Sequence, residues 1–380
     1  MFNLRSINVS LEHETAWVQA GATLGELYYR IAKKSNKLAF PAGACPTVGV
    51  GGHISGGGYG IMMRKYGLSV DNIIDAELID VNGKLLNRKS MGEDLFWAIT
   101  GGGGVSFGVI FSYKIKLVRV PEVVTVFNIE RTYEQNLTTI AQKWVQVADK
   151  LDKDLFLPMI FDVVNDTNGE KTIRAVFRTF YLGNSTNLVA ILNKDFPELG
   201  LLKSDCIEMS WIESVVFYTG FPLGTPTNVL LSRTPQRLNP LKIKSDYLQK
   251  AISKQGFEFI FEKMKELEKQ MLAFNPYGGR MSEISEFAKP FPHRSGNITK
   301  IRYEVNWDEL GVEATSRYLN FTRLMYEYMT PFVSKNPREA FLNYRDLDIG
   351  INSHGLMGRI VMLKVWFMGT SILKRQITRG

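Results

Sequence analysis

Short apolar runs separated by glycine-rich turns dominate the first 120 residues of the chain. Residues 15–22 (TAWVQAGA) predict a β-strand. Apolar side chains then follow at helical spacing, and Thr23 and Glu26 have the spacing of a capping box at the start of a helix. Residues 73–89 predict a β-hairpin, because an Asn-Gly pair joins two alternating runs. Residues 93–104 (EDLFWAITGGGG) predict a short helix that ends in a glycine run.

Longer helices and strands are predicted beyond this region. Residues 137–151 and 257–272 have helical spacing, whereas residues 172–183 and 300–307 read as strands. Near Pro121 the pattern changes from short apolar runs with glycine-rich turns to longer helices and strands, which predicts a domain boundary. We therefore expect one domain over residues 1–120, a second over residues 121–350, and a separate C-terminal tail over residues 351–380.

The composition favours a folded protein with a real core. Hydrophobic residues make up 45% of the chain and aromatic residues 12%. The net charge is +8, but lysine and arginine do not form runs, so nucleic-acid binding is not expected. The most apolar late stretch is too short to cross a bilayer and contains Lys364, so no membrane span is expected. Two cysteines, Cys45 and Cys206, are too few for a disulfide framework or a cysteine-rich metal site.

Asn-x-Ser/Thr sequons favour a secreted glycoprotein. The sequence has six of them, at Asn8, Asn136, Asn165, Asn184, Asn297 and Asn320. No signal peptide is recognised at Met1, so this expectation depends on a leader outside the chain.

The densest chemical pattern is the segment FPAGACPTVGVGGHISGGGYGIMMRKYGLSVDNI, residues 40–73. Glycines at this density allow positive φ and a close approach of backbone N–H groups to a ligand. The segment is neither a Walker loop nor a Rossmann fingerprint. A second glycine run at residues 101–104 strengthens the ligand-binding interpretation. The alternative is a cluster of tight turns with no ligand.

These motifs resemble the FAD-binding domain of berberine bridge enzyme-like oxidases, which have the p-cresol methylhydroxylase (PCMH-type) fold. Later segments, PYGGRMSEIS…PFPHRSGN and NYRDLDIGIN, are similar to the substrate domain of the same family. The resemblance covers about residues 2–352. It implies an α+β protein, with a partial PCMH-type FAD-binding domain and a substrate domain of antiparallel sheet flanked by helices.

The resemblance implies that FAD is bound covalently through the sulfur of Cys45. Val48 occupies the position that controls oxygen access and resembles the oxidase type, and Tyr59 resembles the tyrosine on the substrate side of the flavin. The other residues expected to contact the cofactor are Gly49, Gly51, Gly52, His53, Gly56, Gly57 and Gly103. Without the resemblance, Cys45 reads as a small buried hydrophobe, Tyr59 as a packing aromatic, and His53 as a ring that bonds the loop backbone.

The expected catalytic residues are Tyr344, Lys300 and Arg302. A flavin oxidase needs a base for the hydroxyl proton, and a phenol with a pKa of about 10 serves better beside a cation. Tyr344 matches the family's catalytic tyrosine and Lys300 its neighbouring cation. Strand alternation places Lys300 and Arg302 on one face, with Ile301 and Tyr303 on the other.

Arg302 departs from the family, which more often has Gln or Glu at this position. Arginine cannot act as a base, which disfavours alkaloid ring closure. It favours oxidation of an alcohol or sugar hydroxyl in a substrate that is anionic or polyhydroxylated. The alternative is that Arg302 pairs structurally with a carboxylate.

The expected function is that of an FAD-linked oxidase acting on CH-OH donors, with a small alcohol or carbohydrate as substrate and O2 as acceptor. One alternative is an inactive fragment or pseudogene product that cannot hold FAD stably, and another is a non-enzymatic glycoprotein. Glu283 and Glu286 could suggest paired carboxylates of a glycosidase, but their spacing is more typical of a solvated loop.

Both ends depart from the family pattern. Relatives begin earlier, with an R-S-G-G-H loop whose histidine makes a second covalent bond to the flavin, and that anchor is absent from this chain. After Asn352 the tail replaces the family's C-terminal segment, as a shifted reading frame would do. For intact relatives, the resemblance implies secretion to the cell wall or apoplast.

Overall fold

The computed structural model describes residues 1–235, 238–344 and 346–349. The predicted tail over residues 351–380 lies outside these ranges. Within them, no helix has both the length and the apolar character needed to cross a membrane. The same ranges contain no group of His, Cys, Asp and Glu side chains that could hold a metal ion.

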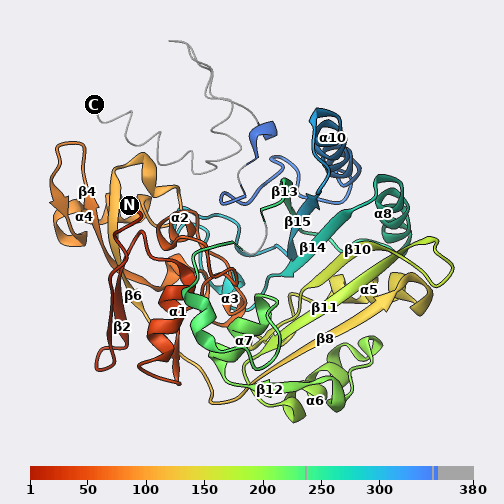
Figure 1. Ribbon diagram of the computed structural model, residues 1–380, viewed down its shortest axis with the longest axis horizontal. Helices are drawn as coiled ribbons and strands as arrows, with labels where there is room; N and C mark the ends of the chain where they lie inside the picture. The colour runs from red at the N-terminus through yellow and green to blue at the C-terminus, as the bar shows by residue number, and fades with distance from the viewer. Residues whose placement is uncertain (236–237, 345, 350–380) are drawn as a thin grey trace.

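The first part of the chain forms a five-stranded antiparallel sheet in the order β1-β2-β6-β4-β5 (Figure 1). Its strands are β1 (Ile7–Ser10), β2 (Thr15–Gln19), β4 (Ile73–Ile79), β5 (Leu85–Leu86) and β6 (Val109–Lys116). A two-stranded pair, β3 (Leu38–Ala39) with β7 (Val118–Arg119), closes this part. The helices with it are α1 (Leu24–Ala32), α2 (Val50–Ser55), α3 (Met63–Tyr66) and α4 (Arg88–Ala98).

Local sequence patterns predicted several of these elements correctly. Helix α1 begins after Thr23, and Thr23 and Glu26 form both hydrogen bonds of the capping box. The hairpin predicted for residues 73–89 is the antiparallel pair β4-β5, with Gly83 at φ 76° in its turn. Helix α4 ends just before the glycine run, as predicted.

The second part is an antiparallel sheet in the order β12-β8-β11-β10-β14-β15-β13, with β9 paired to β11. Its strands are β8 (Val124–Thr132), β9 (Leu155–Phe156), β10 (Met159–Asn165), β11 (Lys171–Tyr181), β12 (Ile207–Met209), β13 (Leu241–Leu248), β14 (Gln270–Pro276) and β15 (Thr299–Asn306). The helices of this part are α5 (Leu137–Val147), α6 (Ser185–Asp195), α7 (Trp211–Tyr218), α8 (Lys254–Leu267), α9 (Arg280–Glu283) and α10 (Val312–Tyr328). Figure 1 shows α8 and α10 along its outer side, so the predicted α+β class, an antiparallel sheet flanked by helices, is confirmed.

The helix predicted for residues 257–272 is wrong at its C-terminal end. Helix α8 stops at Leu267, and β14 begins at Gln270. Glu268 and Lys269 between them have φ of 50° and 39°. The apolar spacing of the helix continues into the strand, so periodicity alone does not locate a break made by two residues with positive φ.

The two faces of the second sheet have different partners. On β15, Ile301 and Tyr303 are fully buried in the core beneath the helices. Lys300 and Arg302 lie on the opposite face, as strand alternation predicted. Tyr247 and Phe341 pack on this side into the core of the first part. The face that carries the predicted catalytic residues is therefore turned toward the glycine-rich loop.

Buried arginines join the two parts of the chain. The Arg64 guanidinium is 1% exposed and donates to the backbone carbonyls of Ala148, Leu151 and Tyr277. Arg294 is equally buried and forms two hydrogen bonds of 2.8 Å with Asp71. A buried charge without its partner would cost free energy. These contacts therefore fix the position of the first part of the chain relative to the second.

Candidate active site

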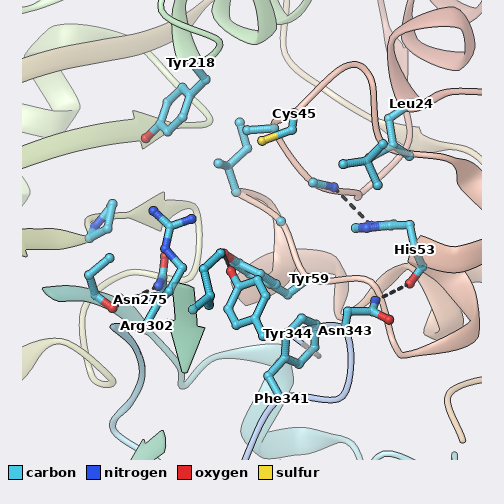
Figure 2. A pocket seen from close by; sticks show the side chains of 18 of the residues that line it. Leu24, Cys45, His53, Tyr59, Tyr218, Asn275, Arg302, Phe341, Asn343 and Tyr344 are labelled. Carbon is cyan, nitrogen blue, oxygen red and sulfur yellow. Dashed lines mark hydrogen bonds between the residues drawn. The ribbon is translucent and has the colours of Figure 1, made fainter. Parts of the chain in front are cut away.

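A cavity of about 670 Å³ lies between the glycine-rich loop and the open face of the second sheet. Figure 2 shows Cys45 on one side of it and Arg302, Tyr59 and Tyr344 on another. The lining brings together a loop near residue 45, strands β10, β11, β14 and β15, and residues 341–344. It is large enough for a substrate-sized molecule beside a flat ring system.

Two of the predicted glycines face open space. A Cβ on Gly49 or Gly52 would meet no atom within 4 Å, and both residues line the cavity. A ligand could therefore approach the backbone closely at these positions. Gly103 also has little around it and adopts φ 87°, but it does not line the cavity, and its N–H donates to the Ser55 carbonyl.

Three other predicted glycines are required by packing within the protein. A Cβ on Gly51 would lie 2.9 Å from Ala20. On Gly56 it would collide with the Asn343 side chain. Gly57 has φ 103° and lies against the ring of Phe291. The glycine pattern thus combines positions open to a ligand with positions where another chain segment approaches closely.

The Cys45 side chain is free and opens on the cavity. This exposure does not fit the alternative of a small buried hydrophobe. Although the side chain can be reached from the cavity, the cavity walls limit the hydration of a thiolate and so raise the pKa of the Cys45 thiol, whereas the nearby Arg302 charge lowers it by less. Without a covalent bond to another group, Cys45 is therefore a protonated thiol at neutral pH. Val48 also faces the cavity, 39% exposed, and its N–H donates to the Cys45 carbonyl.

His53 holds the loop together while one side of it faces the cavity. Its Nε2 accepts a hydrogen bond of 3.2 Å from the Gly43 N–H (Figure 2), which matches the interpretation of a ring that bonds the loop backbone. Burial, with a smaller contribution from the Lys300 charge, lowers the pKa of His53 to about 4. His53 is neutral at pH 7.

The His53 ring should make the fold sensitive to acid. Above pH 6.5 the ring is neutral in both states, but between pH 6.5 and about 4 only the unfolded chain gains a proton. The free energy of unfolding should fall over this range, by about 3 kcal/mol, as pH decreases. Denaturant titrations at pH 7 and pH 4 should show a smaller fall for His53→Gln than for the native chain. The same change at exposed His13 is the control; a parallel fall in both variants would contradict the assignment.

Tyr59 and Tyr344 form the centre of the site, although 285 residues separate them. Their hydroxyl oxygens are 2.5 Å apart. The Lys300 ammonium lies 3.0 Å from the centre of the Tyr59 ring and 4.6 Å from that of Tyr344. Lys300 is fully buried behind these rings and does not line the cavity. Its Nζ has no hydrogen-bond partner among the described residues.

Burial and the neighbouring charge have opposite effects on the pKa of Tyr344. Burial raises the pKa of Tyr344 well above 10, the neighbouring Tyr59 adds to the increase, and Arg302 opposes it. Burial also lowers the pKa of Lys300, with a further contribution from Arg302. Arg302 lines the cavity and contacts Glu304 at 3.2 Å through its Nε. The structural ion pair proposed as an alternative for Arg302 is thus present, but it leaves the guanidinium facing the cavity.

The segment that carries Tyr344 is held from both sides. The Asn343 amide donates to the His53 carbonyl across 2.9 Å (Figure 2). Asp346, whose side chain is 2% exposed, accepts hydrogen bonds of 2.5 Å from Lys242 and Lys244 on β13. The sequence alone does not indicate these positioning contacts, because they join segments about 100 or more residues apart.

Arg178, Tyr218 and Asn275 also line the cavity and were not predicted from the sequence. The alternation of β11 could have placed Arg178 on the open face, but register against the other strands was needed to bring it to the site. Glu283 and Glu286 are exposed and outside the cavity, and Glu283 pairs with Arg280, so the interpretation as a solvated segment fits them.

The chain is similar to known proteins along most of its length. Residues 1–88 match a family model described as an FAD binding domain. Over 355 residues the chain is 59% identical to berberine bridge enzyme-like 8 of Arabidopsis thaliana, covering 93% of this chain and 67% of that relative. The solved structure of BBE-like 28 from Arabidopsis thaliana superposes with a TM-score of 0.91 at 44% identity, covering 96% of this chain and 75% of that one.

A third comparison is with a variant of Phl p 4 described as a glucose oxidase. It superposes with a TM-score of 0.90 at 41% identity and covers 96% of this chain and 73% of its own. The agreement extends across both sheets. The chain belongs to the berberine bridge enzyme-like family of FAD-binding oxidoreductases.

Proposed function

We propose that this protein oxidises an alcohol or sugar hydroxyl group, using FAD attached through Cys45 and O2 as the electron acceptor. The observation that carries the proposal is that Tyr344, Tyr59 and the Cys45 sulfur face one cavity. Open backbone at Gly49 and Gly52 leaves room for a flat ring beside that sulfur. When bound, FAD supplies a two-electron acceptor that oxygen can regenerate.

In this proposal, Tyr344 accepts the proton of the substrate hydroxyl at its phenolic oxygen. Before that transfer Tyr344 is a phenolate, to which the Tyr59 hydroxyl, 2.5 Å away, can donate a hydrogen bond; the transfer leaves Tyr344 as a neutral phenol. The positive charge of Arg302 stabilises that phenolate and opposes the effect of burial, and Lys300, held 4.6 Å from the centre of the Tyr344 ring, adds to this stabilisation when it is protonated. Apolar residues such as Phe156 and Ile160 line the cavity and keep water away from the charged groups.

Relatives support the choice of substrate class at a coarse level. One structural neighbour is described as a glucose oxidase, so a sugar hydroxyl is within the reach of this fold. Arg302 replaces the glutamate that acts as base in the alkaloid-cyclising type, which favours simple hydroxyl oxidation. A valine at position 48 resembles the oxidase type of the family, which supports O2 as the electron acceptor.

The absorbance spectrum of purified protein tests the proposal most directly. We expect a yellow protein whose flavin stays with the polypeptide after denaturation, and whose colour bleaches with substrate under anaerobic conditions and returns with air. A colourless protein that stays flavin-free after refolding with excess FAD would instead support the inactive-fragment or non-enzymatic interpretation. A carrier protein mixed with free riboflavin and denatured in the same way is the control for flavin that is only adsorbed.

We also propose that the protein is secreted and glycosylated. Five of the six sequon asparagines are exposed, and Asn297 is 5% exposed and therefore a poor acceptor. A glycan carried at the five exposed positions would not obstruct the cavity, because none of these asparagines lines it.

A further inference from the structure

The segment that carries Tyr344 passes around the edge of the second sheet. Among the described residues, β13 is the last strand of that sheet. Residues 338–344 and 346–348, here called the strap, lie along this edge and contact both faces of the sheet. Residues 338–344 form neither helix nor strand, so contacts with the rest of the protein decide where they lie.

The two faces of β13 can be told apart by its pairing with β15. Lys244 lies opposite Tyr303, which is buried in the core beneath the helices. Ser245 lies opposite Arg302, which lines the cavity. Because side chains alternate along a strand, the even-numbered residues of 242–246 face the helices and Ser245 faces the cavity side.

Ion pairs hold both ends of the strap on the helix side. Arg338 donates hydrogen bonds of 2.7 and 2.6 Å to the carboxylate of Asp246, which is fully buried. At the other end, Asp346 accepts hydrogen bonds of 2.5 Å from both Lys242 and Lys244. Separating these pairs would leave buried charges without partners, so both ends resist displacement.

The middle of the strap lies on the opposite side of the sheet, at the cavity. The Phe341 N–H donates a hydrogen bond of 2.8 Å to Ser245 Oγ. Figure 2 shows Phe341, Asn343 and Tyr344 together at the cavity, next to Tyr59. The strap cannot pass through the sheet, so it goes around the edge of β13 in both directions. Tyr344 therefore lies between two attachments on the far face.

We propose that Arg338 and Asp346 are positioning residues that set the place of the Tyr344 oxygen from the far face of the sheet. This inference rests on the proposed oxidation, in which that oxygen receives the substrate proton. If the strap shifted, the Tyr344 hydroxyl would move away from Tyr59, which now lies 2.5 Å from it. A displacement of about 1 Å at a reacting group can slow a reaction on the order of 10²-fold.

Hydrogen exchange followed by mass spectrometry tests the attachment of the strap without any substrate. In Asp346→Asn, the amides of residues 338–344 should exchange about tenfold faster than in the native chain. Asp348→Asn removes a more exposed carboxylate that contacts the same two lysines, and should give a smaller increase. It is the second variant, in case Asp346→Asn does not fold. Asp154→Asn is the matched control, because it breaks an aspartate–lysine pair of 2.8 Å outside the strap.

The limiting rate of flavin reduction tests the effect on Tyr344, with D-glucose as the probe under anaerobic conditions. Asp346→Asn should lower this rate about tenfold and change the affinity for glucose much less. In the Tyr344→Phe background, the same substitution should have almost no further effect, because the oxygen that it positions is gone. A general loss of structure would slow the reaction equally in both backgrounds.

The outcomes separate the strap from the oxidation. Exchange of residues 338–344 that stays at the level of Asp154→Asn in both strap variants would overturn the inference. An equal loss of rate in both Tyr344 backgrounds would overturn the positioning role. Faster exchange in a chain whose flavin is not reduced would support the attachment of the strap and overturn only the proposed oxidation of this sugar.

Discussion

Replacing Cys45 with alanine is expected to remove the flavin from the denatured protein. In the proposed function, the Cys45 sulfur forms the bond to the flavin at the cavity wall, beside the open backbone of Gly49 and Gly52. Alanine has no atom that can form the bond, so any flavin that remains should be held by non-covalent contacts and released when the fold is lost. The expected loss is complete for the 380-residue chain.

The measurement is flavin absorbance in the protein fraction after acid precipitation. Cys206→Ala is the matched control, because Cys206 is the other free cysteine and lies outside the cavity. Burial raises the pKa of both thiols, so the two cysteines differ in their position relative to the cavity rather than in acidity. Retention of flavin by denatured Cys45→Ala at the level of the Cys206→Ala control would refute the attachment proposed here.

Replacing Tyr344 with phenylalanine is expected to slow substrate-driven bleaching of the flavin by roughly 10²–10⁴-fold, the range typical of losing a general base. The ring itself packs edge-on against Tyr59 and Phe341, and phenylalanine preserves those contacts. The variant loses only the oxygen that receives the substrate proton. Substrate affinity should therefore change much less than the rate.

Anaerobic stopped-flow measurements separate the two quantities, since the limiting rate reports the chemical step and its concentration dependence reports binding. Tyr133→Phe serves as the control, because Tyr133 is 44% exposed and outside the cavity. A limiting rate within a factor of about two of the control would remove Tyr344 from the mechanism. Comparing the loss of rate in Tyr59→Phe with that in Tyr344→Phe would show how far the two hydroxyls act as a unit.

The role of Lys300 follows from its position rather than from contact with the cavity. Its ammonium is enclosed by Tyr59, Phe341 and Tyr344, with distances of 3.0, 4.2 and 4.6 Å to the ring centres. Burial in this cage disfavours the ammonium form and lowers the pKa of Lys300. Formation of a phenolate on Tyr344 would favour the ammonium form again, so the two groups are coupled through their charges.

Arg302 and Arg178 explain why a family resemblance does not specify the substrate. The tyrosines and the cysteine belong to motifs that could be recognised in the chain, whereas the charge of the cavity depends on which strand residues face it. Arg302 could be placed on the correct face from alternation, but Arg178 required the register of three strand pairs.

Local patterns sufficed wherever neighbours in the chain decide the structure. The capping box at Thr23, the Asn-Gly turn of the β4-β5 hairpin and the alternation that separates Lys300 from Ile301 all depend on residues a few positions apart. The end of α8 was missed for the same reason, because nothing in its periodicity indicates two consecutive residues with positive φ. The α+β class and the FAD-binding family could be inferred because long motifs carry them.

The tertiary structure alone decided how distant segments meet. It brings the Tyr344 hydroxyl to Tyr59, lets Asn343 pack on Gly56, and pairs Asp346 with lysines of β13. These contacts depend on strand register and on the packing of one sheet against the other, and both are settled by burial over the whole molecule. No local pattern contains that information, because the free energy of each contact depends on partners more than 100 residues away.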